Sequence, residues 1–195
     1  MTVKEMIQRV SEYAQGMNVL YVEDEIMIRD NTKLLLETIF PSVDIASNGR
    51  EGVDYYSAKA YDIVITDILM PEMNGVNMIR SMKEINESQR FIVTSACEES
   101  SYLLELINLG VAQFLLKPIQ TEQIIHILYE VVKNIYNERK VYEFTTRLKQ
   151  DLLRQTTLLE QYKEAVDLST MVIKTDGQGK ILYVNELFSK ISGYG

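Results

Sequence analysis

Through the first two-thirds of the chain, short apolar runs alternate with longer stretches of helical spacing. Five runs rich in Val, Ile, Leu and Phe fall at 18–22, 43–46, 62–66, 91–94 and 113–116. Because these runs are continuous rather than alternating, the strands they form are expected to be buried on both faces, as parallel sheets require. The segments between them have apolar residues three or four positions apart. The pattern predicts an α/β fold, a doubly wound parallel sheet with its functional crevice at the strand carboxyl ends.

A different pattern begins near residue 121, where the chain continues to residue 167 without Pro or Gly. Apolar residues repeat there at intervals of seven, in two sets. The first set is Leu128, Ile135 and Tyr142. The second set is Leu152, Leu159 and Val166, with Leu148 and Tyr162 interleaved. Such a repeat favours a helix that pairs with another, since its side chains return to one face about every 3.5 residues. The two sets are out of register, so a long amphipathic helix packed on its own domain is the alternative. We favour a dimerising helix.

The last residues predict a hairpin followed by a short helix. Thr170–Thr175 and Lys180–Val184 read as strands, and Asp176–Gly179 between them is a good turn. Asn185 is placed to cap a helix that contains Leu187, Phe188 and Ile191. A hairpin and one helix cannot bury a core alone, so we expect this segment to be the opening of a larger domain.

Composition and charge narrow the class of protein. A length of 195 residues leaves room for one full domain and a smaller part. The net charge of −8 disfavours non-specific nucleic-acid binding. The single cysteine, Cys97, excludes an internal disulfide framework and fits a reducing compartment. The start has no secretory signal, and no apolar run approaches the roughly 20 residues of a bilayer span. We therefore expect a cytoplasmic protein with neither nucleic-acid nor membrane partners in this segment.

Three carboxylates fall where strands of the predicted sheet end. Glu23 and Asp24 follow the first strand, and Asp67 follows the third. If those strands are neighbours, the three side chains converge and repel one another unless a cation lies among them. Oxygen ligands without His or Cys favour Mg²⁺. Such a metal would neutralise an incoming phosphoryl group and allow the Asp67 carboxylate to attack phosphorus.

A hydroxyl and a lysine complete this set of polar residues. Ser95 ends the fourth strand and can offer a hydroxyl to a phosphoryl oxygen. Lys117 ends the fifth strand and can supply a positive charge. Five polar side chains at the ends of four strands are difficult to obtain by chance, so the sequence predicts a magnesium-dependent phosphorylation site at Asp67.

The same segments resemble a known family. They are Val19–Glu25 (VLYVEDE), Asp62–Gly75 (DIVITDILMPEMNG), Thr94-Ser95-Ala96 and Phe114–Pro118 (FLLKP). Together they resemble the signature segments of response-regulator receiver domains of two-component systems, over about residues 17–120. The resemblance implies a flavodoxin-like, five-stranded parallel sheet of strand order 2-1-3-4-5. It also implies a switch, rather than an enzyme, that is phosphorylated by a histidine kinase, a phosphotransfer protein or a small phosphodonor.

The resemblance assigns a role to each residue of the site. Asp67 is the phospho-acceptor, and Lys117 is the lysine that supports it. Glu23, Asp24 and Asp67 bind Mg²⁺ or Mn²⁺, helped by the backbone carbonyl of Leu69.

Two further positions correspond to the family's switch residues. Ser95 is the switch hydroxyl, preferred over Thr94 because Ala96 follows it and its separation from Lys117 suits the family better. Phe114 stands where the family places a rotating aromatic residue, with a simple core role as the alternative.

The resemblance extends to the organisation of the chain. Ile173–Asp176, Gly179–Asn185 and Phe188–Tyr194 are similar to the opening of a PAS sensory domain. We therefore expect an N-terminal helical extension at 1–16, a receiver domain at 17–120, a long helix or coiled-coil linker with the last receiver helix at 121–168, and the start of a PAS domain at 169–195. The expected partners are the phosphodonor protein and a second copy joined through 121–168. A diguanylate cyclase or histidine kinase is the usual output of similar proteins.

Three other functions fit these residues less well. A phosphohydrolase of the haloacid-dehalogenase type would need a second acid two residues after Asp67, where Leu69 stands. A flavin or nucleotide binder would need a phosphate cradle after the first strand, but Glu23-Asp24-Glu25 repels phosphate. A receiver used only as a scaffold would not need the full set of polar residues.

Overall fold

The computed structural model describes residues 2–96, 100–111 and 113–193 of the chain. The lone cysteine, Cys97, lies outside these residues, as does Tyr194 of the predicted PAS segment. The chain divides into two compact units, Met1–Glu138 (unit 1) and Arg139–Gly195 (unit 2). No helix in the described part of the chain combines the length and apolarity that a bilayer span requires.

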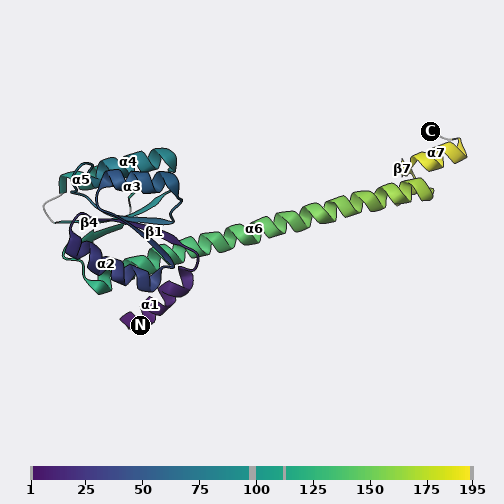
Figure 1. The fold of residues 1–195 in the computed structure, drawn as a ribbon. Coiled ribbons are helices and arrows are strands. Elements are labelled where there is room, and N and C mark those ends of the chain that lie inside the picture. Colours follow the sequence, from purple (N-terminus) through teal and green to yellow (C-terminus); the bar gives the residue numbers. More distant parts are fainter. Residues whose placement is uncertain (1, 97–99, 112, 194–195) are drawn as a thin grey trace. The chain divides into compact units, whose positions relative to one another are not determined.

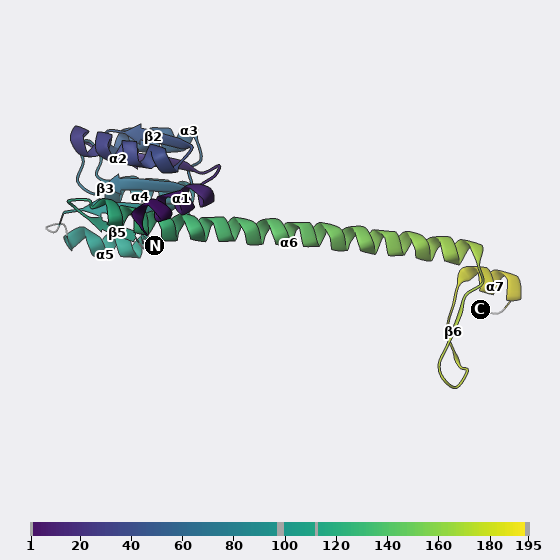
Figure 2. The same cartoon turned by 90° about the horizontal axis from the view of Figure 1, so that it is seen from below.

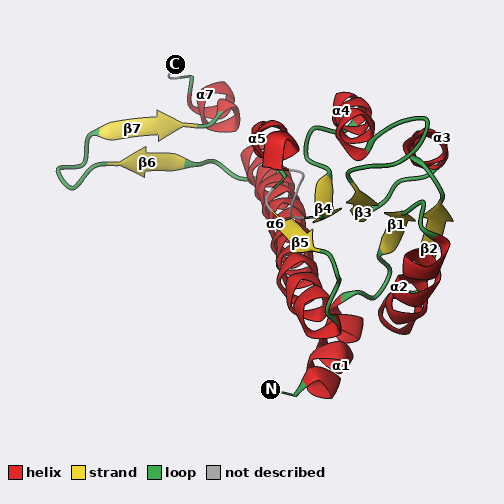
Figure 3. Cartoon of the chain, turned by 90° about the vertical axis from the view of Figure 1, so that its left-hand side faces the viewer, coloured by secondary structure: helices red, strands yellow, loops and turns green. Residues whose placement is uncertain are grey.

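Unit 1 is built on a five-stranded parallel sheet. Its strands are β1 (Asn18–Val22), β2 (Ser42–Ala46), β3 (Ile63–Asp67), β4 (Arg90–Ser95) and β5 (Gln113–Leu116). They lie in the order β2-β1-β3-β4-β5, seen across the sheet in Figure 3. This confirms the predicted strand order and the flavodoxin-like fold. Four of the five residues of β1 and all five of β3 are buried, as expected of central strands covered on both faces.

Helices cover both faces of the sheet. They are α1 (Val3–Tyr13), α2 (Ile26–Ile39), α3 (Gly49–Ala58), α4 (Gly75–Ile85), α5 (Ser100–Asn108) and the start of α6 (Thr121–Ser169). In Figure 1, α3, α4 and α5 lie over one face, and α1, α2 and the start of α6 lie over the other. Alternate residues of β1 point to opposite faces, so Val19 and Tyr21 enter one core and Leu20 and Val22 the other.

The helix that follows β3 begins very close to the end of that strand. The Asn74 side chain caps α4 by accepting a hydrogen bond from the backbone N–H of Asn77. The Gly75 N–H donates to the carbonyl of Ile68 at 2.8 Å. A Cβ at Gly75 would lie 2.1 Å from the carbonyl oxygen of Asp67, so only glycine permits this approach. The turn after Asp67 is thereby held against the end of the sheet.

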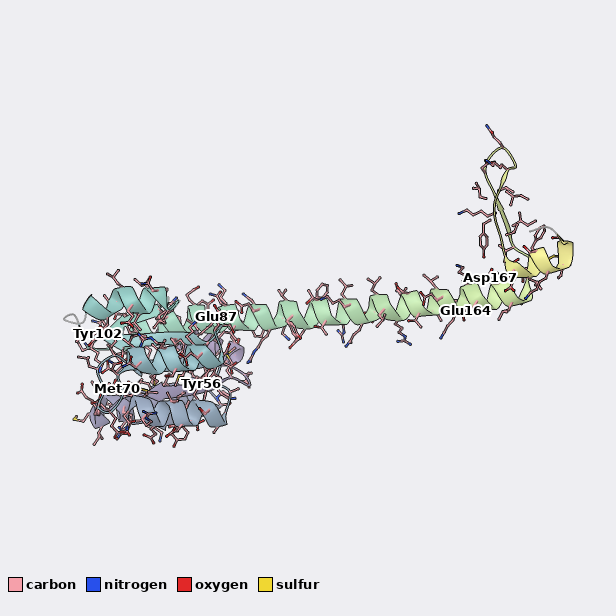
Figure 4. All side chains as sticks on the ribbon, turned by 90° about the horizontal axis from the view of Figure 1, so that it is seen from above. Tyr56, Met70, Glu87, Tyr102, Glu164 and Asp167 are labelled. Atoms are coloured by element: carbon pink, nitrogen blue, oxygen red, sulfur yellow. The ribbon has the colours of Figure 1, made fainter. Side chains whose placement is uncertain are left out.

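Helix α6 changes its surroundings along its length. Its first part buries six apolar side chains in unit 1, which are Ile124, Ile125, Leu128, Val131, Val132 and Ile135. The helix is interrupted by neither Pro nor Gly and continues into unit 2. There its large apolar side chains are exposed, and in Figure 4 side chains stand out around the helix as far as Glu164 and Asp167. The two heptad sets therefore have different surroundings. Leu128 and Ile135 of the first set belong to the core of unit 1, whereas the residues of the second set are exposed.

The rest of unit 2 is a small hairpin and a helix at the end of α6 (Figure 2). Strands β6 (Ile173–Thr175) and β7 (Ile181–Val184) are antiparallel, and α7 spans Glu186–Ser192. β6 is shorter than predicted, because α6 extends to Ser169 with the Thr170 N–H donating to the Val166 carbonyl, and the Asn185 side chain accepts from the Val172 N–H. Asn185 also caps α7 as predicted, by accepting from the Phe188 N–H.

Candidate functional site

Three carboxylates meet at the carboxyl ends of two neighbouring strands. β1 and β3 pair in parallel with Val22 opposite Thr66, so the residues that follow each strand or end it are adjacent. One carboxylate oxygen from each of Glu23, Asp24 and Asp67 lies within 4.8 Å of the others. We call these residues the acidic cluster. Glu23 is fully buried and Asp67 is 5% exposed, while Asp24 is partly exposed. The structure thus brings together the three acids that the sequence predicted to converge.

Lys117 joins two members of the acidic cluster. It follows β5, its peptide bond to Pro118 is cis, and its side chain is only 14% exposed. Its Nζ donates to Asp67 Oδ2 at 2.7 Å and to Glu23 Oε1 at 3.1 Å. Asp67 Oδ1 accepts from the backbone N–H of Ile68 at 2.8 Å. Both oxygens of Asp67 therefore accept a hydrogen bond, one from a side chain and one from the backbone.

The electrostatics of the site reflect burial and crowding of like charges. Burial raises the pKa of Glu23, and the negative charge of Asp67 adds to the effect, while Lys117 opposes it. Burial by itself would lower the pKa of Lys117, but its hydrogen bonds to Asp67 and Glu23 and their charges outweigh this and raise the pKa. The lysine therefore stays protonated and offsets only part of the charge of three acids.

The donor set fits a hard divalent cation. All three acids offer oxygen, and among the described residues no sulfur or imidazole ligand accompanies them. Mg²⁺ and Mn²⁺ accept such carboxylate ligands and keep part of their hydration shell. The excess negative charge beside a single ammonium group favours binding of a further cation.

Two residues near the site were not predicted. The Tyr21 hydroxyl donates to Glu23 Oε2 at 3.4 Å, and Arg29 Nη1 donates to the backbone carbonyl of Glu23 at 3.1 Å. Tyr21 precedes Glu23 by two residues, so strand alternation places both on one face and could have indicated the contact. The arginine contact depends on how α2 leaves the loop, for which the sequence offers no comparable signal.

The expected switch residues lie on the neighbouring strands β4 and β5. Thr94 pairs with Asp67 in the sheet and is fully buried, and its hydroxyl donates to the carbonyl of Thr66 at 3.3 Å. The Ser95 hydroxyl donates to the carbonyl of Ala96 at 2.9 Å. Phe114 is partly buried and packs against the core formed with α3, α4 and α5. The side chain of Leu69 is 50% exposed and apolar.

Known proteins similar to this chain match its first unit. Residues 19–129 match the family model described as the response regulator receiver domain. A chemotaxis protein CheY of Thermotoga maritima is 34% identical over 119 residues, which are 60% of this chain and 99% of that protein. The uncharacterized transcriptional regulatory protein YesN of Bacillus subtilis is 32% identical over 137 residues, which are 69% of this chain and 37% of that protein.

A solved structure agrees with these matches. The N-terminal domain of an uncharacterized protein from Wolinella succinogenes has 31% sequence identity and a TM-score of 0.58. The alignment covers 66% of this chain and 99% of that one.

Proposed function

The chain belongs to the response regulator receiver domain family of two-component systems, and from this premise we propose that it is a Mg²⁺-dependent switch phosphorylated on Asp67. Receiver domains are generally phospho-acceptors rather than enzymes, and they interact with histidine kinases or phosphotransfer proteins. The single observation that carries the proposal is the position of Asp67, which lies in the acidic cluster with Lys117 Nζ 2.7 Å from its Oδ2.

The reaction transfers a phosphoryl group to a carboxylate oxygen of Asp67. A new oxygen–phosphorus bond forms, and the bond from phosphorus to the donor's histidine nitrogen, or to the leaving oxygen of an acyl phosphate, breaks. Glu23, Asp24 and Asp67 would hold Mg²⁺ or Mn²⁺ together with the backbone carbonyl of Leu69. When bound, the ion neutralises charge on the phosphoryl oxygens. The Ile68 N–H orients Asp67, and Lys117 transfers its hydrogen bond from Asp67 to a phosphoryl oxygen.

The apolar residue two positions after Asp67 favours a switch over a phosphohydrolase. Hydrolysis of ordinary esters needs a group that protonates the leaving oxygen. Leu69 occupies the position two residues after Asp67 where that acid would stand, and its side chain is apolar and half exposed.

Phosphorylation would be sensed by Ser95, which turns from the Ala96 carbonyl toward the phosphoryl group, and by Phe114. Thr94 is the weaker candidate, because it pairs with Asp67 inside the sheet, whereas Ser95 is the last residue of β4. The result is a population shift between two packings of the face that contains β5 and α6, biased by contacts made only with the phosphoryl group.

The signal would leave unit 1 through helix α6. We define the exposed seam as the apolar side chains that continue the second heptad set in unit 2, which are Leu148, Leu152, Leu159, Tyr162 and Val166. Between 46% and 68% of each side chain is exposed, so the seam has no partner within the described part of the chain. A parallel second copy would cover the seam, because both helices then repeat in register every 3.5 residues or so.

Residues 169–195 would be the opening of a PAS domain that receives this signal. The hairpin and α7 leave Ile173, Ile181 and Ile191 about half exposed, as expected of a segment whose core needs further chain. Neither unit indicates which output domain receives the signal. If dimerisation measured by sedimentation is identical with and without bound beryllofluoride, this relay is wrong.

Phosphorylation of Asp67 can be tested directly. We expect acetyl phosphate with Mg²⁺ to add one phosphoryl group, detected by intact-protein mass spectrometry and mapped to Asp67 after borohydride reduction. Asp67→Asn should abolish the adduct, while Asp54→Asn, an exposed position on α3, should retain it. Absence of an adduct and of any beryllofluoride response in the unaltered protein would refute the proposed function.

A further inference from the structure

The hydroxyl of Tyr21 contacts Glu23, a member of the acidic cluster. Tyr21 is fully buried in β1, and its side chain points to the face covered by α1, α2 and α6. A buried tyrosine hydroxyl needs a hydrogen-bond partner, and here the carboxylate of Glu23 accepts from it at 3.4 Å. The side chain of Thr32 in α2, also buried, lies beside the same hydroxyl. The hydroxyl therefore connects a helix to a member of the acidic cluster.

The two oxygens of Glu23 have different kinds of partner. Oε1 accepts from Lys117, which also donates to the Asp67 carboxylate and therefore changes its contacts when that carboxylate is esterified. Oε2 accepts from Tyr21, whose ring is fixed in the core and takes no part in the transfer. The tyrosine contact is thus the one side-chain contact of Glu23 described here that does not depend on the state of Asp67.

We propose that Tyr21 is a positioning residue for the metal site: its hydroxyl fixes the orientation of the Glu23 carboxylate and so sets the affinity of the acidic cluster for Mg²⁺. The inference rests on the proposed function, since it takes the acidic cluster to be the place where Mg²⁺ binds. Without the hydroxyl, Glu23 keeps the Lys117 contact at Oε1 but loses the contact that orients Oε2, so ion binding must supply that order at a cost in conformational entropy. Thr32 contributes indirectly by holding the tyrosine hydroxyl in place.

The test is direct titration of the full chain with MgCl₂ by isothermal titration calorimetry. We expect Tyr21→Phe to raise the Kd for Mg²⁺ by about tenfold, the lower end of the range for residues that orient metal ligands, because the 3.4 Å bond is long. At saturating Mg²⁺ the extent of beryllofluoride binding should match the unaltered protein within about twofold.

A matched control separates positioning from stability. Tyr56 is 7% exposed, and its hydroxyl donates to Gln89 at 2.8 Å on the other face of the sheet. Tyr56→Phe also removes one buried hydrogen bond, so it should lower the Tm but leave the Kd for Mg²⁺ unchanged. Thr32→Val should raise the Kd for Mg²⁺ by a smaller factor than Tyr21→Phe. Thr32→Ser, which keeps a hydroxyl, should have the Kd of the unaltered protein.

Two outcomes would overturn the inference. Tyr21→Phe and Thr32→Val could both bind Mg²⁺ as tightly as the unaltered protein, or Tyr56→Phe could weaken Mg²⁺ binding as much as Tyr21→Phe does. Either result would leave phosphorylation of Asp67 intact. Failure of the unaltered protein to bind Mg²⁺ would instead refute the proposed function itself.

Discussion

Helix α6 contributes apolar side chains to both units, but they have opposite surroundings. In unit 1, Leu128 is fully buried and Ile135 is 6% exposed. In unit 2, Leu152 and Leu159 are 64% and 68% exposed. All four residues belong to heptad repeats of similar composition. A heptad repeat therefore determines which face of a helix is apolar. The surface that covers this face comes from elsewhere in the chain or from another molecule.

The change from buried to exposed side chains along α6 occurs just after its contacts with α1 and β4. In unit 1, the ring of Tyr13 in α1 lies 4.9 Å from that of Tyr136, and Arg90 pairs with Glu138 at 2.6 Å. Tyr142, the last member of the first heptad set, is already 73% exposed. The first repeat therefore runs past the edge of unit 1, and a new register starts beyond it.

The largest expected effect comes from shortening one leucine in each unit. Leu128→Ala should lower the free energy of unfolding by about 2–5 kcal/mol, because it leaves a cavity in the core. Leu152→Ala should cost less than about 0.5 kcal/mol in the monomer, because its side chain is already in water. Urea denaturation at a protein concentration too low for self-association measures both. Equal losses would show that the exposed part of α6 is packed.

A second pair of variants tests what covers the exposed seam. Leu152 lies on the seam, whereas its neighbour Leu153, 68% exposed, lies beside it. Leu152→Lys should weaken self-association by more than about tenfold, because a dimer would bury an unpaired ammonium group. Leu153→Lys should change it little. Sedimentation equilibrium gives both constants, and equal effects of the two variants would contradict a heptad interface.

The smallest effect concerns ion pairs in the two units. In unit 1, a hydrogen bond from Lys59 lowers the pKa of Asp44 against the opposing effect of burial, with help from Tyr61. In unit 2, a hydrogen bond from Lys190 lowers the pKa of Glu186, whose side chain is largely exposed. Asp44→Asn should cost less than about 1 kcal/mol, since the pair is partly exposed.

The pH dependence of that cost has a definite sign. A carboxyl whose pKa is lower in the folded state stabilises the protein fully above its ordinary pKa, 3.8 for Asp44. The contribution disappears as the pH falls through the lowered value. The difference between Asp44→Asn and the unaltered protein should therefore shrink in acid, as followed by thermal melts at several pH values, while Glu186→Gln should show no measurable difference. A difference that grows in acid would contradict the pairing.

Local patterns were sufficient for much of this molecule. Continuous apolar runs predicted all five strands of the sheet, with ends within two residues of those observed, because burial on both faces leaves little freedom of composition. The convergence of Glu23, Asp24 and Asp67 followed from a single rule, that parallel strands end at the same edge of a sheet. The cap at Asn185 was also predicted, since a side chain bonded three residues ahead is a local contact.

Only the tertiary structure decided what each apolar or polar group meets. Lys117 is 94 residues from Glu23 along the chain, and no local pattern says that one ammonium group bridges Glu23 and Asp67. The burial of Leu128 beside the exposure of Leu152 depends on where α1, α2 and the sheet end against α6. The physical reason is range: hydrogen-bond caps and side-chain periodicity act over a few residues, whereas burial and charge pairing depend on surfaces that distant segments supply.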